Sequence, residues 1–121
     1  MTNDLYYREE ILEHWQNPLN FGVIKNADLV IEQVNPLCGD EVTFYFKFKD
    51  GKIDSVKFSG SGCAISIASA SILSENIRNK KVSALSKITG EDVLKLLGGP
   101  VAPARLKCAF LALEALRQVQ G

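Results

Sequence analysis

Three cysteines, Cys38, Cys63 and Cys108, carry the most specific chemistry in this sequence. Thiolates bind soft metal ions and exchange sulfur with other thiols. Asp40 stands two residues after Cys38, so that one ion could contact both side chains. Three thiols and one carboxylate make a four-ligand set for a soft metal such as zinc or iron. Because these residues lie far apart in the chain, only tertiary folding can bring them together.

Two of the cysteines lie in turn-like surroundings. Cys38 belongs to the segment Asn-Pro-Leu-Cys-Gly-Asp at 35–40, whose glycine permits an unusual backbone angle. Cys63 ends a glycine-containing turn and begins a helical pattern, and a helix N-terminus stabilises an anionic sulfur. We expect Gly60 and Gly62 to let the backbone approach a bound group closely. Free cysteines are often buried, but usually in apolar elements, so we interpret both as functional.

Cys108 lies inside a long apolar helical pattern and could be a packing residue. An α-helix turns by roughly 100° per residue, and on this count Cys108 lies more than about 100° around the helix from the centre of the predicted core stripe. That stripe consists of Leu106, Ala109, Phe110, Leu113 and Leu116. The side of Cys108 carries Ala112, Ala115 and Val119, so burial against another element is the alternative. Arg105 and Lys107 flank the cysteine, and we expect them to lower the pKa of its thiol.

The cysteine spacing is not that of a zinc finger or zinc ribbon, because the chain contains no C-x₂-C pair. His14, the only histidine, lies in the first helical pattern. We favour a solvent-facing or packing role for it over a role as a metal ligand.

Length and composition describe an ordinary globular chain that we expect to form one domain over residues 1–121. Its 121 residues are 46% hydrophobic and 23% charged, with a formal net charge of zero. This composition does not favour nucleic-acid binding, and no apolar run approaches the roughly 20 residues of a membrane span. The polar, acidic first ten residues do not resemble a signal or transit peptide, so we expect a cytoplasmic protein. An odd number of cysteines in a reducing compartment favours metal ligands or reactive thiols over disulfides.

The elements that position these residues follow from local patterns. A helical pattern over Asp4–Gln16 ends at Asn17-Pro18. Strand patterns follow at 27–34, 42–48 and 52–59, and Asp50-Gly51 predicts a hairpin between the last two. Helices are predicted at 64–77, 82–88, 90–97 with Thr89 as N-cap, and 104–119. Strands followed by helices predict an α+β fold, with helices on one face of a three-stranded antiparallel sheet.

At these residues the chain resembles the NifU/IscU-like family of iron–sulfur cluster assembly scaffolds, from about Tyr6 to Leu116. The resemblance rests on four segments in order. They are HWQNPLNFG at 14–22, NPLCGD at 35–40, GSGCAISIASAS at 60–71 and RLKCA at 105–109.

The resemblance implies a SufE/NifU-like fold and, first, a scaffold or carrier, with a sulfurtransferase-like role as the open alternative. It implies a transient [2Fe–2S] cluster on Cys38, Cys63 and Cys108, with Asp40 beside them. Sulfur would come from a cysteine desulfurase, and the cluster would pass to apo-protein acceptors. Zinc can occupy the same ligands in SufU-like members. We expect a monomer or a weak dimer.

The chain departs from the family pattern in three respects. Lys107 stands where IscU-type members have a histidine ligand, as in the R-x-K-C arrangement of SufU-like members. Those members usually carry an extra segment before the third cysteine, whereas here Cys63 and Cys108 are only 45 positions apart. The chaperone-docking stretch is altered to GPVAPA at 99–104, which does not favour an Hsp70-type partner.

Three functions therefore stay open. The first is a cluster scaffold in which Lys107 and Arg105 steer anionic sulfur or the cluster. The second is a zinc-dependent sulfur acceptor, favoured by Lys107 and opposed by the short interval before Cys108. The third is a structural zinc domain that serves as an interaction module.

Overall fold

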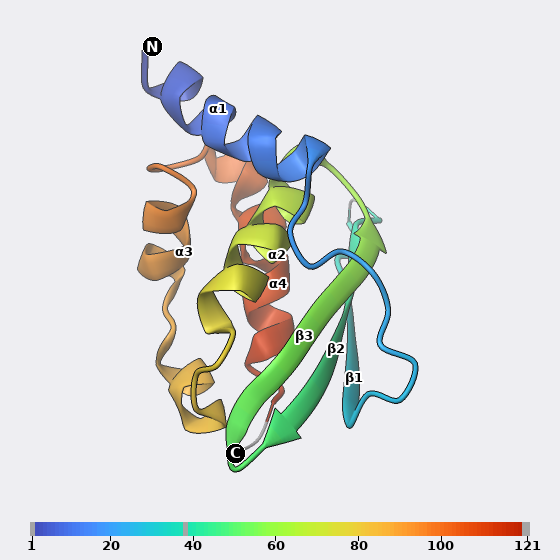
Figure 1. Ribbon diagram of the computed structural model, residues 1–121. Coiled ribbons are helices and arrows are strands. Elements are labelled where there is room, and N and C mark those ends of the chain that lie inside the picture. The colour runs from blue at the N-terminus through green and yellow to red at the C-terminus, as the bar shows by residue number, and fades with distance from the viewer. Residues whose placement is uncertain (1, 38, 120–121) are drawn as a thin grey trace.

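The computed structural model describes residues 2–37 and 39–119, and their side chains from residue 9 onward. Figure 1 shows a small sheet with the helices gathered on one side of it. The elements are α1 (Thr2–Gln16), β1 (Leu29–Val34), β2 (Glu41–Lys49), β3 (Lys52–Ser61), α2 (Ala64–Ile77), a 3₁₀ helix η1 (Val82–Lys87), α3 (Gly90–Leu96), a second 3₁₀ helix η2 (Pro103–Arg105) and α4 (Leu106–Leu116). The predicted α+β fold, strands followed by helices, is confirmed.

The sheet is an antiparallel meander in the order β1-β2-β3. Strands β2 and β3 meet at a tight turn in which Asp50 and Gly51 both have positive φ, 54° and 75°. Two central residues with positive φ match the right-handed twist of a hairpin, which explains the Asp-Gly pair. At the other end of this pair Glu41 faces Ser61, so the segments that carry Asp40 and Cys63 leave the sheet side by side. The sheet thereby brings two of the predicted ligands to one end of the molecule.

One face of the sheet is covered by α2 and α4. Alternate residues of β2 point into this core, as the alternating pattern predicts, and Phe44 and Phe46 are completely buried. Helix α2 packs on β3, α4 packs on β1 and β2, and the two helices contact each other. Helix α1 lies across α2, where Ile11 enters the core while Trp15 stays half-exposed. This packing places the start of α2 next to the start of α4.

The predicted core stripe of α4 is only partly right. Leu113, Leu116 and Ala109 are buried, but Leu106 and Phe110 are only partly buried. Leu111, Ala112 and Ala115 are buried as well, on the side that carries Cys108. Helix α4 contacts α2, α3, β1 and β2, so it is enclosed around most of its circumference. The alternative that Cys108 is buried against another element is therefore confirmed.

The segment predicted as coil between α1 and β1 lines the free edge of β3. The Gly22 N–H donates to the Phe58 carbonyl at 2.7 Å, and the Phe58 N–H donates to the Asn20 carbonyl at 2.9 Å. The predicted N-cap of α3 is confirmed, because the Thr89 and Asp92 side chains each accept a backbone N–H of the other residue.

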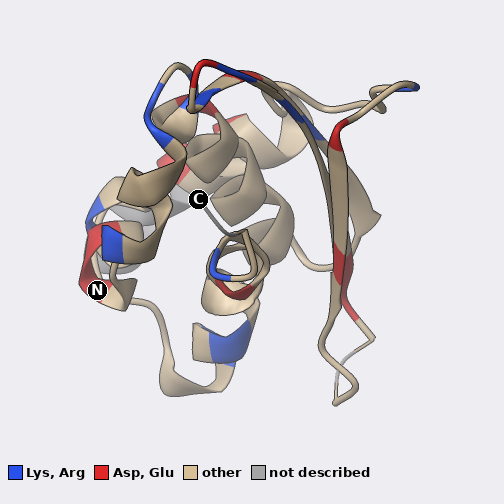
Figure 2. Cartoon of the chain, turned by 90° about the horizontal axis from the view of Figure 1, so that it is seen from below, with Lys and Arg blue, Asp and Glu red and all other residues tan. Residues whose placement is uncertain are grey.

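Acidic and basic residues are distributed over both the sheet and the helices in Figure 2. Within the described part of the chain, no helix is long and apolar enough to cross a membrane.

Candidate metal centre

The structure describes the side chains of three of the four predicted ligands, and these three lie together. One ligand atom each of Asp40, Cys63 and Cys108 lies within 4.8 Å of the other two. They come from the loop before β2, the N-cap of α2 and the first turn of α4. Cys38, the fourth predicted ligand, lies outside the described residues. A buried carboxylate beside two thiols is a donor set that fits zinc or iron.

Backbone hydrogen bonds join Asn35 to Gly39 and Asp40 and so fix the position of Asp40. The Asn35 N–H donates to the Asp40 carbonyl and the Gly39 N–H donates to the Asn35 carbonyl, both at 2.8 Å. The Asn35 side chain accepts the Leu37 N–H at 3.1 Å. Gly39 has a φ of 77°, which confirms the unusual backbone angle predicted for it. Asp40 itself is only 7% exposed, so its carboxylate points into the protein.

The glycines before Cys63 serve close packing of the protein on itself. A Cβ atom at Gly62 would lie 2.8 Å from Cγ of Asp40, and one at Gly60 would lie 2.3 Å from the Glu41 carbonyl oxygen. Neither distance can be tolerated without a shift of the neighbours. The prediction was that these glycines admit a bound group, and the structure shows the Asp40 side chain and the β2 backbone in that space instead.

Ser66 connects the described ligands, and the sequence-based prediction did not assign it a role. Its hydroxyl donates to Oδ2 of Asp40 at 2.7 Å and lies 3.7 Å from Sγ of Cys63. The same hydroxyl lies 3.4 Å from the backbone carbonyl of Cys108. Ser66 stands three residues after Cys63 in the first turn of α2, and residues three apart on a helix share a face. That spacing was a signal that could have identified it.

The environment keeps Asp40 ionised. Burial raises the pKa of its carboxyl group, but the hydrogen bonds from Ser66, from the Cys63 N–H and from the two thiols outweigh burial and lower it. An ionised carboxylate is the form that binds a metal ion. Asp40 is therefore ready to act as a ligand.

The environment of Cys108 has the opposite effect and disfavours ionisation of its thiol. Its side chain is 5% exposed, and burial, with the neighbouring Cys63 and Asp40, raises the pKa of its thiol to about 12. The prediction that Arg105 and Lys107 lower this pKa is wrong, because both cations are exposed to solvent, which screens their charge. A thiol in this environment releases its proton to solvent readily only when a strong positive partner, such as a metal ion, binds the sulfur in its place.

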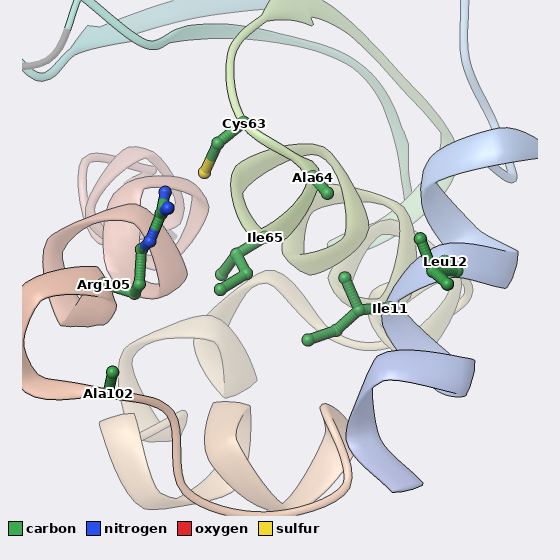
Figure 3. A pocket seen from close by; sticks show the side chains of 7 residues that line it. All are labelled: Ile11, Leu12, Cys63, Ala64, Ile65, Ala102 and Arg105. Carbon is green, nitrogen blue, oxygen red and sulfur yellow. The ribbon is translucent and has the colours of Figure 1, made fainter. Parts of the chain in front are cut away.

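Arg105 and Lys107 lie beside different grooves. A groove of about 340 Å³ begins at Cys63 and is lined by Arg105 and by apolar side chains of α1 and α2. Figure 3 shows the Arg105 guanidinium group and the Cys63 sulfur pointing toward each other across this groove. Lys107 instead lines a second groove, with Pro36 and Glu114.

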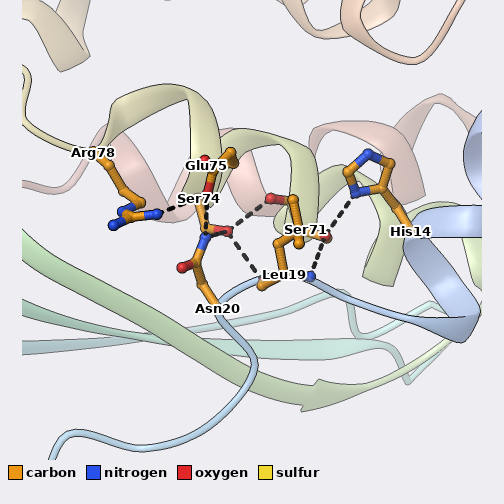
Figure 4. A network of polar contacts seen from close by, with 7 residues as sticks. All are labelled: His14, Leu19, Asn20, Ser71, Ser74, Glu75 and Arg78. Carbon is orange, nitrogen blue, oxygen red and sulfur yellow. Dashed lines mark hydrogen bonds and ion pairs between the residues drawn. The ribbon is translucent and has the colours of Figure 1, made fainter.

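His14 is held in a separate network on α2 (Figure 4). Its Nδ1 atom lies 2.8 Å from the Ser71 hydroxyl, which also accepts the Leu19 N–H at 2.8 Å. Among the described residues, the cluster of metal-binding side chains consists of Asp40, Cys63 and Cys108 and does not include His14. His14 therefore has the packing role that the sequence favoured.

The fold agrees with comparisons to known proteins. The profile of the NifU-like N-terminal domain matches residues 6–120, and the chain belongs to this family. The resemblance noted in the sequence is thereby confirmed.

Relatives of this chain include proteins named as scaffolds and a protein named as a sulfurtransferase. The chain is 40% identical to the iron–sulfur cluster assembly scaffold protein IscU 1 of Archaeoglobus fulgidus, over 93% of this chain and 72% of that protein. It is 35% identical to the zinc-dependent sulfurtransferase SufU of Bacillus subtilis, over 95% of this chain and 89% of that protein. A crystal structure of a candidate SUF-system scaffold from Fervidobacterium islandicum matches with a TM-score of 0.77 and 34% identity, over 92% of this chain and 93% of that one.

Proposed function

We propose that this protein is an iron–sulfur cluster assembly scaffold. It would receive sulfur from a cysteine desulfurase, build a transient [2Fe–2S] cluster and pass it to apo-protein acceptors. The observation that carries the proposal is the meeting of Asp40, Cys63 and Cys108 within 4.8 Å at one end of the fold. Membership of the NifU-like family supports it. Cys38, two residues before Asp40 in the chain, is proposed as the fourth ligand.

The mixed ligand set suits a site that must both hold and release its cargo. Thiolates of Cys63 and Cys108 are soft donors with high affinity for iron. The carboxylate of Asp40 is a harder donor, so we assign to it the weakest contact with the cluster. Cys63 is partly exposed while Cys108 and Asp40 are buried, which leaves one side of the site open for entry and exit.

The groove beside Cys63 supports a route for sulfur. Its apolar wall, which includes Ile11 and Ile65, could cover the segment of a partner that carries the sulfur. Arg105 stands across from the Cys63 thiol, where a fixed positive charge attracts an anionic sulfur. We assign the steering role first to Arg105, and we retain Lys107 as a second cation near the 35–40 loop.

Anaerobic reconstitution tests this proposal. The purified protein is incubated with ferrous iron, cysteine, a cysteine desulfurase and a dithiol reductant, which supplies the electrons that convert persulfide sulfur to sulfide, and is then analysed for iron, acid-labile sulfide and visible absorption. We expect a charge-transfer spectrum and equal amounts of iron and sulfide. Cys63→Ser should lose both, whereas His14→Ala, a variant in the separate network, should keep them. A colourless protein that binds no iron would contradict the proposal.

A second function, a zinc-dependent sulfur acceptor, is favoured by Lys107 and by the similarity to SufU of Bacillus subtilis. In this reaction a thiolate of this chain attacks the terminal sulfur of the desulfurase persulfide. The persulfide S–S bond breaks, a new S–S bond forms on the acceptor, and the desulfurase thiolate leaves. Bound zinc would keep the remaining ligands ionised until sulfur arrives.

Mass spectrometry distinguishes the two functions. After incubation with desulfurase and cysteine, a sulfur acceptor gains the mass of one sulfur atom on a single cysteine and retains zinc without assembling a cluster. A purely structural zinc domain would unfold on chelation and gain no sulfur.

A further inference from the structure

Ser66 occupies the centre of the candidate metal centre without being one of its ligands. It is 3% exposed, and its hydroxyl lies at 2.7 Å from Oδ2 of Asp40, 3.7 Å from Sγ of Cys63 and 3.4 Å from the Cys108 carbonyl. It therefore contacts a residue from each of the three elements that build the site.

Geometry decides which of these contacts dominates. A serine hydroxyl has one proton to donate, and the 2.7 Å contact with Asp40 is the shortest of the three. Oδ2 also accepts the Cys63 N–H at the longer distance of 3.4 Å. Asp40 is thus held at one oxygen by the first turn of α2, while Gly62 leaves it the space that a Cβ atom would fill.

We propose that Ser66 is a positioning residue that orients the Asp40 carboxylate toward the metal site. The inference rests on the proposed function in one respect, namely that Asp40 is a ligand. Hydrogen bonds from residues behind the ligands fix ligand orientation, and their loss typically lowers metal affinity by about 10–100-fold. Without the Ser66 hydroxyl, the carboxylate would lose its shortest hydrogen bond to the protein.

Ser69 provides a matched control on the same helix. It is 1% exposed, and its hydroxyl donates to the Ala109 carbonyl at 2.7 Å. Like Ser66, it is a buried serine of α2 whose hydroxyl reaches the backbone of α4. This hydrogen bond does not involve Asp40, Cys63 or Cys108. A general loosening of the contact between α2 and α4 would affect both serines alike.

The test measures zinc affinity of the full chain by chelator competition, with Co(II) absorption as a second measurement. We expect Ser66→Ala to weaken zinc binding by about 10–100-fold and to shift the Co(II) ligand-field bands. We expect Ser69→Ala to bind zinc within twofold of the wild type with unchanged Co(II) bands. Circular dichroism and urea unfolding of both variants establish that they fold.

A double-mutant cycle shows whether Ser66 acts through Asp40. In an Asp40→Ala background, removal of the Ser66 hydroxyl should change zinc affinity by less than twofold, because the residue that it orients is gone. An equal loss in both backgrounds would contradict a positioning role through Asp40.

The outcomes separate this inference from the proposed function. If the wild type binds zinc and Ser66→Ala binds it equally well, or if Ser69→Ala loses as much affinity, the role of Ser66 is overturned and the site stands. If the wild type binds neither zinc nor Co(II), the proposed site is overturned and the role of Ser66 with it.

Discussion

Serines on helix α2 serve two regions of this protein that differ in what they contact. Near the start of the helix, Ser66 donates to a buried carboxylate between two cysteines. Further along, Ser71 and Ser74 bind His14, the Leu19 backbone and the Asn20 side chain. The first region holds the groups that we propose as metal ligands, and the second fastens α1 and the following segment to α2.

The difference shows that residue type alone does not assign a role. His14 and Asp40 both belong to residue types that bind metals, and each bonds to a serine of the same helix. Asp40 has two thiols beside it, so its environment contains further side chains of metal-binding types. His14 bonds to the Ser71 hydroxyl, which also accepts the Leu19 N–H, and these contacts join α1 to α2 without a further metal-binding side chain in the cluster of described residues. The partners within a few ångströms decide the function.

The largest expected effect comes from removing a proposed ligand. Cys108→Ser should lower zinc affinity by more than the roughly 10–100-fold that loss of an outer partner costs, because a soft donor is replaced by a hard one. His14→Ala, measured by the same chelator competition, should stay within twofold. An equal loss of zinc affinity in the two variants would contradict the functional difference between the two regions.

A substitution at Gly62 should damage the metal region by steric contact. The new methyl group of Gly62→Ala would lie 2.8 Å from Cγ of Asp40 and displace it. We expect a loss of about 1–3 kcal/mol in the free energy of unfolding, as for other overpacked sites, together with weaker zinc binding. Urea unfolding and zinc titration measure the two effects.

Gly51→Ala is the control for this experiment. The substitution introduces strain, because Gly51 has a φ of 75°. The added Cβ atom would have no other atom within 4 Å, and Gly51 lies at the end of the hairpin opposite the candidate metal centre. It should lose stability while keeping zinc affinity. Zinc binding that falls equally in both variants would show that general destabilisation is the cause.

Removing a hydroxyl from the second region should affect stability alone. Ser71→Ala deletes the partner of the His14 ring and of the Leu19 N–H, and we expect a loss of about 1–3 kcal/mol in the free energy of unfolding. Zinc affinity should stay within twofold of the wild type. A change in zinc affinity as large as that of Ser66→Ala would contradict the separation of the two regions.

The smallest effect concerns the acid stability of the protein without added metal. The pKa of Asp40 in the folded protein lies below its usual value of 3.8, with burial opposing the hydrogen bonds that lower it. Its stabilising contribution is therefore present above about pH 4 and is lost as the pH falls through the lower, folded-state pKa. Asp40→Asn should flatten the acid side of the stability curve. Urea midpoints between about pH 2 and pH 6 measure this, and an unchanged slope would show that the Asp40 carboxylate is not stabilised by folding.

Local patterns allowed much of the fold to be predicted. The alternation of β2, the Asp50-Gly51 turn and the Thr89 cap each depend on residues within a few positions of one another, and all three are confirmed. The bounds of α2 were predicted without error, because a glycine turn before it and a change of periodicity mark its start. The α4 stripe was predicted less well, since periodicity identifies one buried face and this helix is enclosed by several elements.

The sequence by itself determined the order of strands and helices and the residues suited to bind a metal. It also placed Cys63 at a helix start, because glycines and a change of period are local signals. Only the tertiary structure decided that Asp40, Cys63 and Cys108 meet, that Ser66 joins them, and that Arg105 rather than Lys107 stands across from Cys63. These contacts join segments that are distant in the chain, and their distances depend on how α2 and α4 pack on the sheet, which no local pattern encodes.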